Sequence, residues 1–411
     1  MQNTKNVPKI RFKNFTYAWE LKSLENLYVL SGSGGTPLTQ NKDYYENGNI
    51  NFLTISDVSN SGKYIFETEK KITNLGLKNS TAWIVPKNSI SFAMYASVGK
   101  VCILGKETAT SQAFFNMKFA NEELTQMIYY KLKLFELTDF WTSLISTGTQ
   151  GNLNSEKIKN LSFMLPTELE EQSKISLMLQ HIDTVISLRE REQKIFDSLK
   201  KSLLEKMFAY QDNPYPAIRF RDFTHAWELK KLKNEALFFN GKSYENSVSD
   251  NGKFELVNLN SVSLDGNLKS SNKFVSTTDE TLRKNDLVMI LSDIAHGLLL
   301  GKVAIIDQEN KYILNQRVAG LRIKGNVLAE YLKFLININQ RYFKEKGAGT
   351  SQLNISKPIV ENFQFLSTKN KKEQEKISSL FTLLEKLQSL LERKTEKLKQ
   401  IKKSMLENLF V

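Results

Sequence analysis

The stretch IRFKNFTYAWEL, from Ile10 to Leu21, occurs a second time as IRFRDFTHAWEL, from Ile218 to Leu229. Nine of the twelve positions are identical. Internal repeats dictate architecture, so an unusual string written twice predicts two copies of one module.

Further matches follow the opening in the same order in both copies. They pair NFLTISDV (51–58) with FELVNLNSV (254–262), GKVCI (99–103) with GKVAI (301–305), STGTQGNLN (146–154) with GAGTSQLN (347–354), and EQSKIS (171–176) with EQEKIS (373–378). Such an ordered series is very improbable by chance. The repeat therefore extends over the whole chain.

Each copy begins with short β-branched and aromatic runs that Gly, Asn and Asp interrupt, a pattern typical of strands and loops. One helix is expected in each copy among these strands, from Glu123 and from Asn326, because apolar residues recur there every three or four positions. The sequence thus predicts an α+β fold with two pseudo-symmetric α/β domains.

The tail of each copy changes character after Pro166 and Leu366, where glycine and proline vanish. Apolar residues then recur in heptads, which predicts two helices of about 40 residues and about 60 Å each that pair as an antiparallel coiled coil. The alternative is that each helix packs only on its own domain. The expected seam consists of Ile175, Ile182, Phe196, Leu199 and Leu203 in the first helix and of Ile377, Leu384, Leu391, Leu398 and Met405 in the second.

These signals divide the chain into five parts. They are a first domain (1–165), a central helix (166–209), a linker with two prolines (210–217), a second domain (218–366) and a C-terminal helix (367–411).

The charge of the chain favours a polyanionic partner. A formal net charge of +13 suits nucleic acid, because Lys and Arg release counterions from phosphates; the alternative is a merely basic surface. Cys102 is the single cysteine, which excludes an internal disulfide and a cysteine-based zinc site. The first residues lack the apolar segment of a signal peptide and no run is long enough to span a membrane, so a cytoplasmic location is expected.

Motifs for catalysis fail one by one. Gly241-Lys242-Ser243 lacks the glycine that a phosphate-binding loop needs five residues earlier, where Ala236 stands. The stretch DNPYP, which begins at Asp212, differs from the Asn-Pro-Pro-Tyr signature of amino methyltransferases, because only one proline stands between Asn213 and Tyr215. We interpret it as the end of a helix. The three histidines show no metal-ligand spacing, so neither a metal nor a catalytic residue is assigned. The sequence favours binding over turnover.

A duplicated chain with a W-E-L-K-x-L opening, a GTQ-x-N-L-like turn and an E-Q-x-K-I-S helix start resembles the specificity subunit of type I restriction-modification systems. The resemblance covers essentially all 411 residues. It implies two target recognition domains that each read half of a split double-stranded DNA sequence, with two antiparallel helices as the spacer.

The same resemblance implies the partners. Two methyltransferase subunits would dock on the chain and motor-nuclease subunits would join them. The specificity chain itself would be non-catalytic, and S-adenosylmethionine, ATP and Mg²⁺ would belong to the partner subunits.

DNA-facing residues are expected where the copies differ most, because side chains that read sequence vary while shared ones hold the fold. Amides suit adenine edges, and Lys and Arg suit guanine or phosphate. The expected contacts in the first copy are Gln40, Asn41, Lys42, Tyr44, Ser97, Lys100, Thr149, Gln150 and Asn152. Those in the second are Lys242, Ser243, Tyr244, His296, Lys302, Arg317, Thr350, Ser351 and Gln352.

Plainer readings stay open for several of these residues. The variable loops are equally compatible with simple solvation, and Gly99-Lys100 and Gly301-Lys302 with turns that enter strands. For the whole chain, the alternatives are a stand-alone coiled-coil DNA-binding regulator and an enzyme whose active site the sequence does not reveal.

Overall fold

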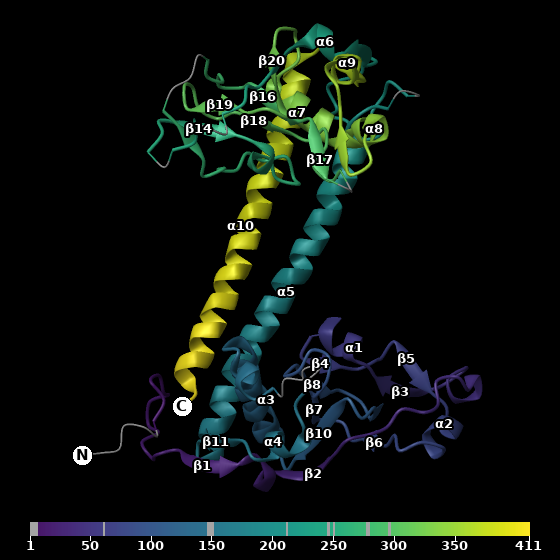
Figure 1. The fold of residues 1–411 in the computed structure, drawn as a ribbon, viewed down its shortest axis with the longest axis vertical. Helices are drawn as coiled ribbons and strands as arrows, with labels where there is room; N and C mark the ends of the chain where they lie inside the picture. The colour runs from purple at the N-terminus through teal and green to yellow at the C-terminus, as the bar shows by residue number, and fades with distance from the viewer. Residues whose placement is uncertain are drawn as a thin grey trace. The chain divides into compact units, whose positions relative to one another are not determined.

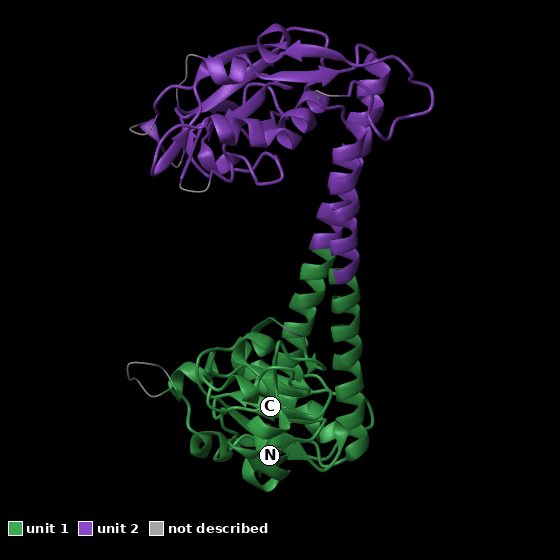
Figure 2. Cartoon of the chain, turned by 90° about the vertical axis from the view of Figure 1, so that its right-hand side faces the viewer, with its two compact units in different colours: residues 1–190, 393–411 green, residues 191–392 purple. Residues whose placement is uncertain are grey.

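The computed structural model describes residues 7–60, 62–145, 152–210, 213–244, 247–249, 251–276, 280–294 and 297–411. The chain divides into two compact units, unit 1 (residues 1–190 and 393–411) and unit 2 (residues 191–392), as Figure 2 shows. Two long helices, α5 (Leu169–Met207) and α10 (Lys371–Leu409), each contribute residues to both units (Figure 1). The strands and short helices outside α5 and α10 are called here the sheet body of each unit.

The sheet body of unit 1 contains a five-stranded sheet of order β2-β10-β7-β8-β4 and a four-stranded sheet of order β5-β3-β9-β6. The strands are β2 (Tyr28–Gly32), β3 (Ile50–Leu53), β4 (Tyr64–Ile65), β5 (Lys70–Ile72), β6 (Ile84–Val85), β7 (Ser89–Ala93), β8 (Val101–Leu104), β9 (Thr108–Thr110) and β10 (Phe114–Phe119). Both β7 and β8 are buried throughout. This burial explains why VCIL lacks polar residues, and in SISFA the alternating Ser89 and Ser91 are buried as well.

Helices complete this unit. The helix α3 (Glu122–Leu137) packs against β7, β8 and β10, and the side chain of Asn121 caps its first turn. The remaining short elements are α1 (Ile55–Asn60), α2 (Asn74–Lys78), α4 (Ser155–Lys159), η2 (Leu24–Asn26), η3 (Lys42–Tyr44) and η4 (Phe140–Ser143). A separate pair, β1 (Glu20–Ser23) with β11 (Ser162–Leu165), joins the opening of the copy to the strand before α5.

Unit 2 repeats this topology. Its sheets run β13-β20-β16-β18 and β15-β14-β19, which match β2-β10-β7-β8 and β5-β3-β9, and the pair β12-β22 matches β1-β11. The strands are β12 (Glu228–Lys231), β13 (Ala236–Asn240), β14 (Phe254–Val257), β15 (Phe274–Val275), β16 (Leu287–Ile290), β17 (Ser292–Ile294), β18 (Val303–Ile305), β19 (Tyr312–Leu314), β20 (Val318–Ile323), β21 (Gln352–Asn354) and β22 (Gln364–Ser367). The repeat in sequence is therefore a repeat of fold.

The helix expected from Asn326 is two helices in the structure, α7 (Ala329–Ile338) and α8 (Gln340–Lys346). They meet at Asn339, whose side-chain amide donates to the carbonyl of Leu335. Such local bonds compete with helix continuation. Unit 2 also contains α6 (Leu232–Glu235), α9 (Lys357–Glu361) and η6 (Leu259–Ser261).

The repeated opening string joins each sheet body to the long helices through a buried ion pair. In unit 1, Arg11 donates two hydrogen bonds of 2.6 and 2.7 Å to Glu171, at the start of α5. In unit 2, Arg219 makes the same contact with Glu373 at the start of α10, at 2.6 and 2.9 Å. Because both glutamates are completely buried, these two-pronged bonds fix the helix starts.

The opening string of each copy also packs against the C-terminal end of a long helix. Trp19 is buried against Phe410 with ring centroids 6.4 Å apart, and Trp227 against Phe208 at 6.2 Å. The amide of Ile10 donates to the carbonyl of Asn408 in the same region. The tryptophans are therefore core anchors.

The long helices pair with each other inside each unit. Along the contacts the residue numbers rise on α5 while they fall on α10, so the segments run antiparallel. The polar pairs are Asp183–Lys402 (2.5 Å) and Glu190–Lys399 (2.6 Å) in unit 1, and Gln193–Glu392 (3.4 Å), Asp197–Gln388 (2.9 Å) and Lys200–Glu385 (4.0 Å) in unit 2.

On α10 the polar contacts with α5 come from Glu385 and Glu392, each directly after an expected seam residue, Leu384 or Leu391. Leu199 is 52% exposed, so its assignment to the seam is wrong. Apolar residues elsewhere on the two helices are buried or half-buried as well, Ile186 at 9% exposed among them. Ile175 and Ile377 are buried in the cores, and the half-buried members are Ile182, Phe196, Leu203, Leu384, Leu391, Leu398 and Met405.

No helix within the described ranges combines the length and apolar character that crossing a bilayer requires.

Candidate nucleic-acid interface

The variable loop of unit 1 that begins at Thr39 has a defined conformation. The side chain of Asn41 accepts from the amide of Asp43 and caps η3. The amide of Thr73 donates to the carbonyl of Tyr44 at 2.9 Å, and this bond ties the loop to the start of α2. Gln40 and Lys42 remain exposed, although Lys42 lies 3.8 Å from Glu46. The loop presents an amide and a cation on a fixed backbone.

In unit 2 the counterpart loop passes beside the turn before β20. Lys242 forms a parallel bridge with Asn315, and its amide donates to the carbonyl of Leu314 at 3.2 Å. A Cβ on Gly241 would lie 2.0 Å from the carbonyl oxygen of Asn315, so only glycine permits this approach. Ser243 is exposed, and Tyr244 packs on a small apolar cluster. The fold thus brings Lys242 close to the turn that contains Arg317.

This turn forms one wall of a polar hollow of about 440 Å³. Arg317 is exposed and has φ 66°, a left-handed backbone that is costly for a residue with a side chain. Asn315 is buried, and its Oδ1 has no hydrogen-bond partner in the described part of the chain. The lining residues are Val248, Leu256, Asn258, Leu259, Asn260, Lys273, Asn315, Gln316 and Arg317.

Sequence reasoning found Arg317 in this hollow but missed the amides beside it. Asn258 and Asn260 lie in the stretch that matches 51–58, where the first copy has Thr54 and Ser56. The signal was present, because these positions differ between the copies inside an otherwise matching motif. Amides and a guanidinium in one hollow have the chemistry that reads base edges.

The glycine-flanked turns pair with the loops after β7 and β16. In unit 1, Asn152 forms a bridge with Tyr95, close to the exposed Ser97. In unit 2, β21 pairs with β17, and the side chain of Gln352 donates to Ser292. Thr350 and Ser351 are exposed beside it. Thr149, Gln150 and His296 lie outside the described residues.

The Gly-Lys pairs are turns that enter strands. Gly99 has φ 90° and Gly301 φ 75°, and an added Cβ would lie 2.2 Å from Trp141 in one case and 2.5 Å from Phe343 in the other. The glycines thus allow aromatic rings to pack closely on the turns that lead into β8 and β18. Lys100 is half-buried.

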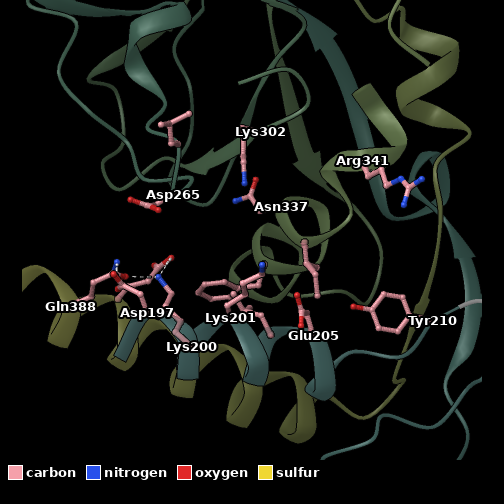
Figure 3. Close-up of a pocket in the computed structure, with 15 residues that line it drawn as sticks. Asp197, Lys200, Lys201, Glu205, Tyr210, Asp265, Lys302, Asn337, Arg341 and Gln388 are labelled. Atoms are coloured by element: carbon pink, nitrogen blue, oxygen red, sulfur yellow. Dashed lines mark hydrogen bonds and ion pairs between the residues drawn. The ribbon is translucent and has the colours of Figure 1, made fainter. Parts of the chain in front are cut away.

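Lys302 is also half-buried and lines a cleft of about 810 Å³ in unit 2 (Figure 3). Desolvation lowers the pKa of Lys302, and the carboxylate of Asp265 opposes that shift. The cleft is shared with Asp197 and Lys200 of α5. Lys302 therefore faces a cleft that α5 and α10 also line, and its phosphate contact stays a prediction.

Cys102 is buried in β8, and burial raises the pKa of its thiol to about 12. The thiol stays protonated near neutral pH and is a poor nucleophile. The exposed and hollow-lining groups described above offer hydrogen bonds and positive charge. Their chemistry is that of recognition.

The comparison with protein families decides the assignment. The family described as "Type I restriction modification DNA specificity domain" matches residues 17–195 and again residues 225–401. The chain belongs to this family. The two matches coincide with the two copies of the repeat.

Individual members of the family are distant relatives. The chain is 25% identical over 222 residues to the "Type I restriction enzyme MjaIX specificity subunit" of Methanocaldococcus jannaschii, and this match spans 52% of the chain and 50% of the relative. It is 27% identical over 151 residues to the "Type I restriction enzyme HindI specificity subunit" of Haemophilus influenzae, spanning 36% of the chain and 32% of the relative. The matched region is thus half or less of the length of either relative.

Solved structures share the fold over nearly the whole length. The type I S subunit from M. genitalium matches with a TM-score of 0.63 at 16% identity, covering 98% of this chain and 99% of that one. A chain from a study of "complex assembly" and "conformational transition of the type I R-M system" matches with a TM-score of 0.57 at 13% identity, covering 95% and 97%. At these identities the likeness concerns the specificity-family fold alone.

Proposed function

We propose that this chain is the DNA sequence-specificity subunit of a type I restriction-modification complex. One observation carries the proposal: a sheet body of the specificity family occurs twice, and each copy is joined to the long helices by the same buried Arg–Glu contact. Two readers in one chain suit a target made of two half-sites with a fixed gap, because the readers must match the rise and twist of the duplex.

The exposed chemistry supports DNA as the ligand. The net charge of +13 favours a polyanion, and the hollow beside Arg317 offers amides together with a guanidinium. In this proposal Gln40 and Lys42 of unit 1 and Lys242 and Arg317 of unit 2 face the duplex. Base edges are read by the amide and guanidinium groups, and phosphates by the lysines.

The long helices have surfaces suited to protein partners. Large apolar side chains remain outside the cores on both helices, which is unusual for helices that only pair with each other. They include Leu177, Val185, Leu188, Ile195, Leu199, Leu383, Leu387, Leu390 and Ile401, each at least 40% exposed. We assign these surfaces to two methyltransferase subunits, with motor-nuclease subunits joining the assembly. S-adenosylmethionine, ATP and Mg²⁺ would be bound by those partners.

The test is the modification pattern of the host genome, read by modification-sensitive sequencing with and without the gene for this chain. We expect methylation at a split motif that disappears when the chain is absent. Modification that persists without the chain, or that follows one continuous palindrome, would refute the proposal.

Co-purification and DNA binding distinguish the proposed specificity subunit from the second candidate function, a stand-alone coiled-coil regulator. The specificity subunit is expected to bind its target tightly only together with a methyltransferase, whereas the regulator would bind as tightly alone. Turnover of DNA by the isolated chain would indicate an enzyme.

A further inference from the structure

One carboxylate in unit 1 contacts the sheet body and both long helices. Asp183 of α5 accepts a hydrogen bond of 2.7 Å from the hydroxyl of Tyr130 in α3 and forms an ion pair of 2.5 Å with Lys402 of α10. The Tyr130 hydroxyl accepts in turn from Lys63, directly before β4, at 2.9 Å. A single polar chain therefore joins β4, α3, α5 and α10.

Unit 2 has the same junction with different groups. Glu385 of α10 lies 2.7 Å from Lys333 of α7 and 4.0 Å from Lys200 of α5. Lys333 also donates to Asn267, at 3.2 Å. This chain again joins the sheet body to both helices.

The two junctions occupy equivalent places in the repeat. Asp183 and Glu385 are 202 residues apart, and so are Lys200 and Lys402. The sheet-body partners are not equivalent, because a lysine–tyrosine relay in unit 1 replaces a direct lysine contact in unit 2. Different side chains therefore connect the sheet body to the helices at the same place in the two units. The position of the connection is shared by the two units, whereas the individual bonds are not.

These junctions are shielded enough to hold a single geometry. The side chains of Asp183 and Glu385 are 22% and 13% exposed, and those of Lys402 and Lys333 20% and 7%. A shielded charge that loses its partner is strongly destabilised, so a sheet body that tilts away from the helices loses more than ordinary packing contacts. The Arg–Glu contact attaches the opening of each copy at the helix start. The junction adds a polar attachment at a second place along the helices, which restricts the tilt of the sheet body.

We propose that Asp183 and Glu385 are positioning residues that fix the tilt of each sheet body on the helix segments of its own unit, and thereby make the chain selective for one gap between half-sites. This inference rests on the proposed function. Neither carboxylate needs to touch DNA for the effect. Its consequence is selectivity for gap length that is separate from selectivity for bases.

The experiment uses the full chain in complex with its methyltransferase. Binding is measured to duplexes that carry the mapped target with the gap lengthened or shortened by one base pair, and to duplexes with single base changes in each half-site. The variants are Asp183→Asn and Glu385→Gln. Tyr130→Phe is a milder variant that removes one hydroxyl and keeps the ring.

Glu190→Gln is the matched control, because Glu190 pairs with Lys399 of α10 at 2.6 Å and lies on the same helix as Asp183. The control removes an equal charge from a helix–helix contact and leaves the junction intact. We expect the preference for the native gap over its neighbours to fall about tenfold or more in the junction variants, while discrimination between bases stays unchanged. The control is expected to keep both.

The outcomes separate the inference from the proposed function. If the unmodified complex binds no split target, the proposed function fails. If it does, and the junction variants keep their preference for the native gap as Glu190→Gln does, the positioning inference fails. Equal losses of gap and base selectivity, or failure of all three junction variants to fold beside a folded control, would assign the carboxylates to stability alone and overturn it.

Discussion

The buried pair of Arg219 and Glu373 joins the opening of the second copy to the start of α10. Glu373 is fully buried, and the side chain of Arg219 is 13% exposed. Glu373→Gln leaves a shielded guanidinium without its counter-charge, which is expected to lower the free energy of unfolding by about 3 kcal/mol or more. Hydrogen exchange of peptides from unit 2 measures the change.

Arg341→Gln is the control, because Arg341 pairs with Glu345 at the surface with side chains 88% and 58% exposed. Its effect is expected to stay within about 0.5 kcal/mol. Equal exchange in the two variants would show that the buried pair contributes no more than a surface pair.

Lys63 makes the stability of unit 1 depend on pH. Burial lowers the pKa of Lys63 to about 7 from its ordinary 10.5, with Asp183 and Glu122 opposing the shift and Lys402 adding to it. Between these two values the folded state binds fewer protons than the unfolded state. The free energy of unfolding therefore rises with pH from about 7 to 10.5, and this group contributes no slope below pH 7.

Lys63→Met is expected to remove most of this rise in the free energy of unfolding. The rise is on the order of a few kcal/mol between pH 7 and pH 10.5. A smaller rise from about pH 8 remains, because burial also lowers the pKa of Lys131 to about 8. Urea unfolding of unit 1 at pH 6.5 and pH 9 tests this. Parallel pH profiles for the parent and the variant would contradict it.

At single residues, sequence reasoning succeeded where local chemistry decides and failed where distant partners do. The burial of Trp19 and Trp227 follows from a large apolar ring in a repeated motif. The contact of Arg11 with Glu171 was not predicted, because 160 residues separate the pair and either residue alone resembles an exposed charge. For Lys302, nothing local indicates that its side chain lines a cleft shared with α5.

Among the elements, the long helices were predictable because they lack glycine and proline for some 40 residues. The polar contacts between the two helices were not. Heptads indicated Leu384 and Leu391 on α10, and they do not indicate the polar contacts that the neighbouring Glu385 and Glu392 make with α5. Apolar periodicity identifies a helix face to be covered, but it does not say whether a helix, a sheet body or another subunit covers it.

The exposed apolar residues of α5 give a test at the element scale. Leu188 is 60% and Ile195 61% exposed, so Leu188→Glu and Ile195→Glu are expected to leave folding intact. Each should strongly reduce co-purification of the methyltransferase, because a charge would be buried at the interface. Lys194→Glu introduces the same side chain about 100° around the helix and is expected to have a smaller effect. If the methyltransferase co-purifies undiminished with both Leu188→Glu and Ile195→Glu, these two residues are not part of the docking surface.

At the scale of the whole molecule, the repeat predicts that each half of the target depends on one sheet body. Replacing residues 10–166 with the equivalent segment of another family member exchanges the sheet body of unit 1. Both long helices and unit 2 stay unchanged. The incoming segment must supply an arginine at the place of Arg11 and a tryptophan at that of Trp19, because Glu171 and Phe410 remain as their partners.

Such a hybrid is expected to modify DNA at a target with one new half-site, one unchanged half-site and the same gap. The half-site read by unit 2 stays because the hollow beside Arg317 lies wholly within that unit. The gap stays because the helices, together with Asp183 and Glu385, are untouched, provided that the incoming segment keeps a hydroxyl at the place of Tyr130. Modification-sensitive sequencing of a host carrying the hybrid reads both features at once. A change in both half-sites would mean that the two units do not read independently, and a changed gap would mean that the sheet body itself helps to set the spacing.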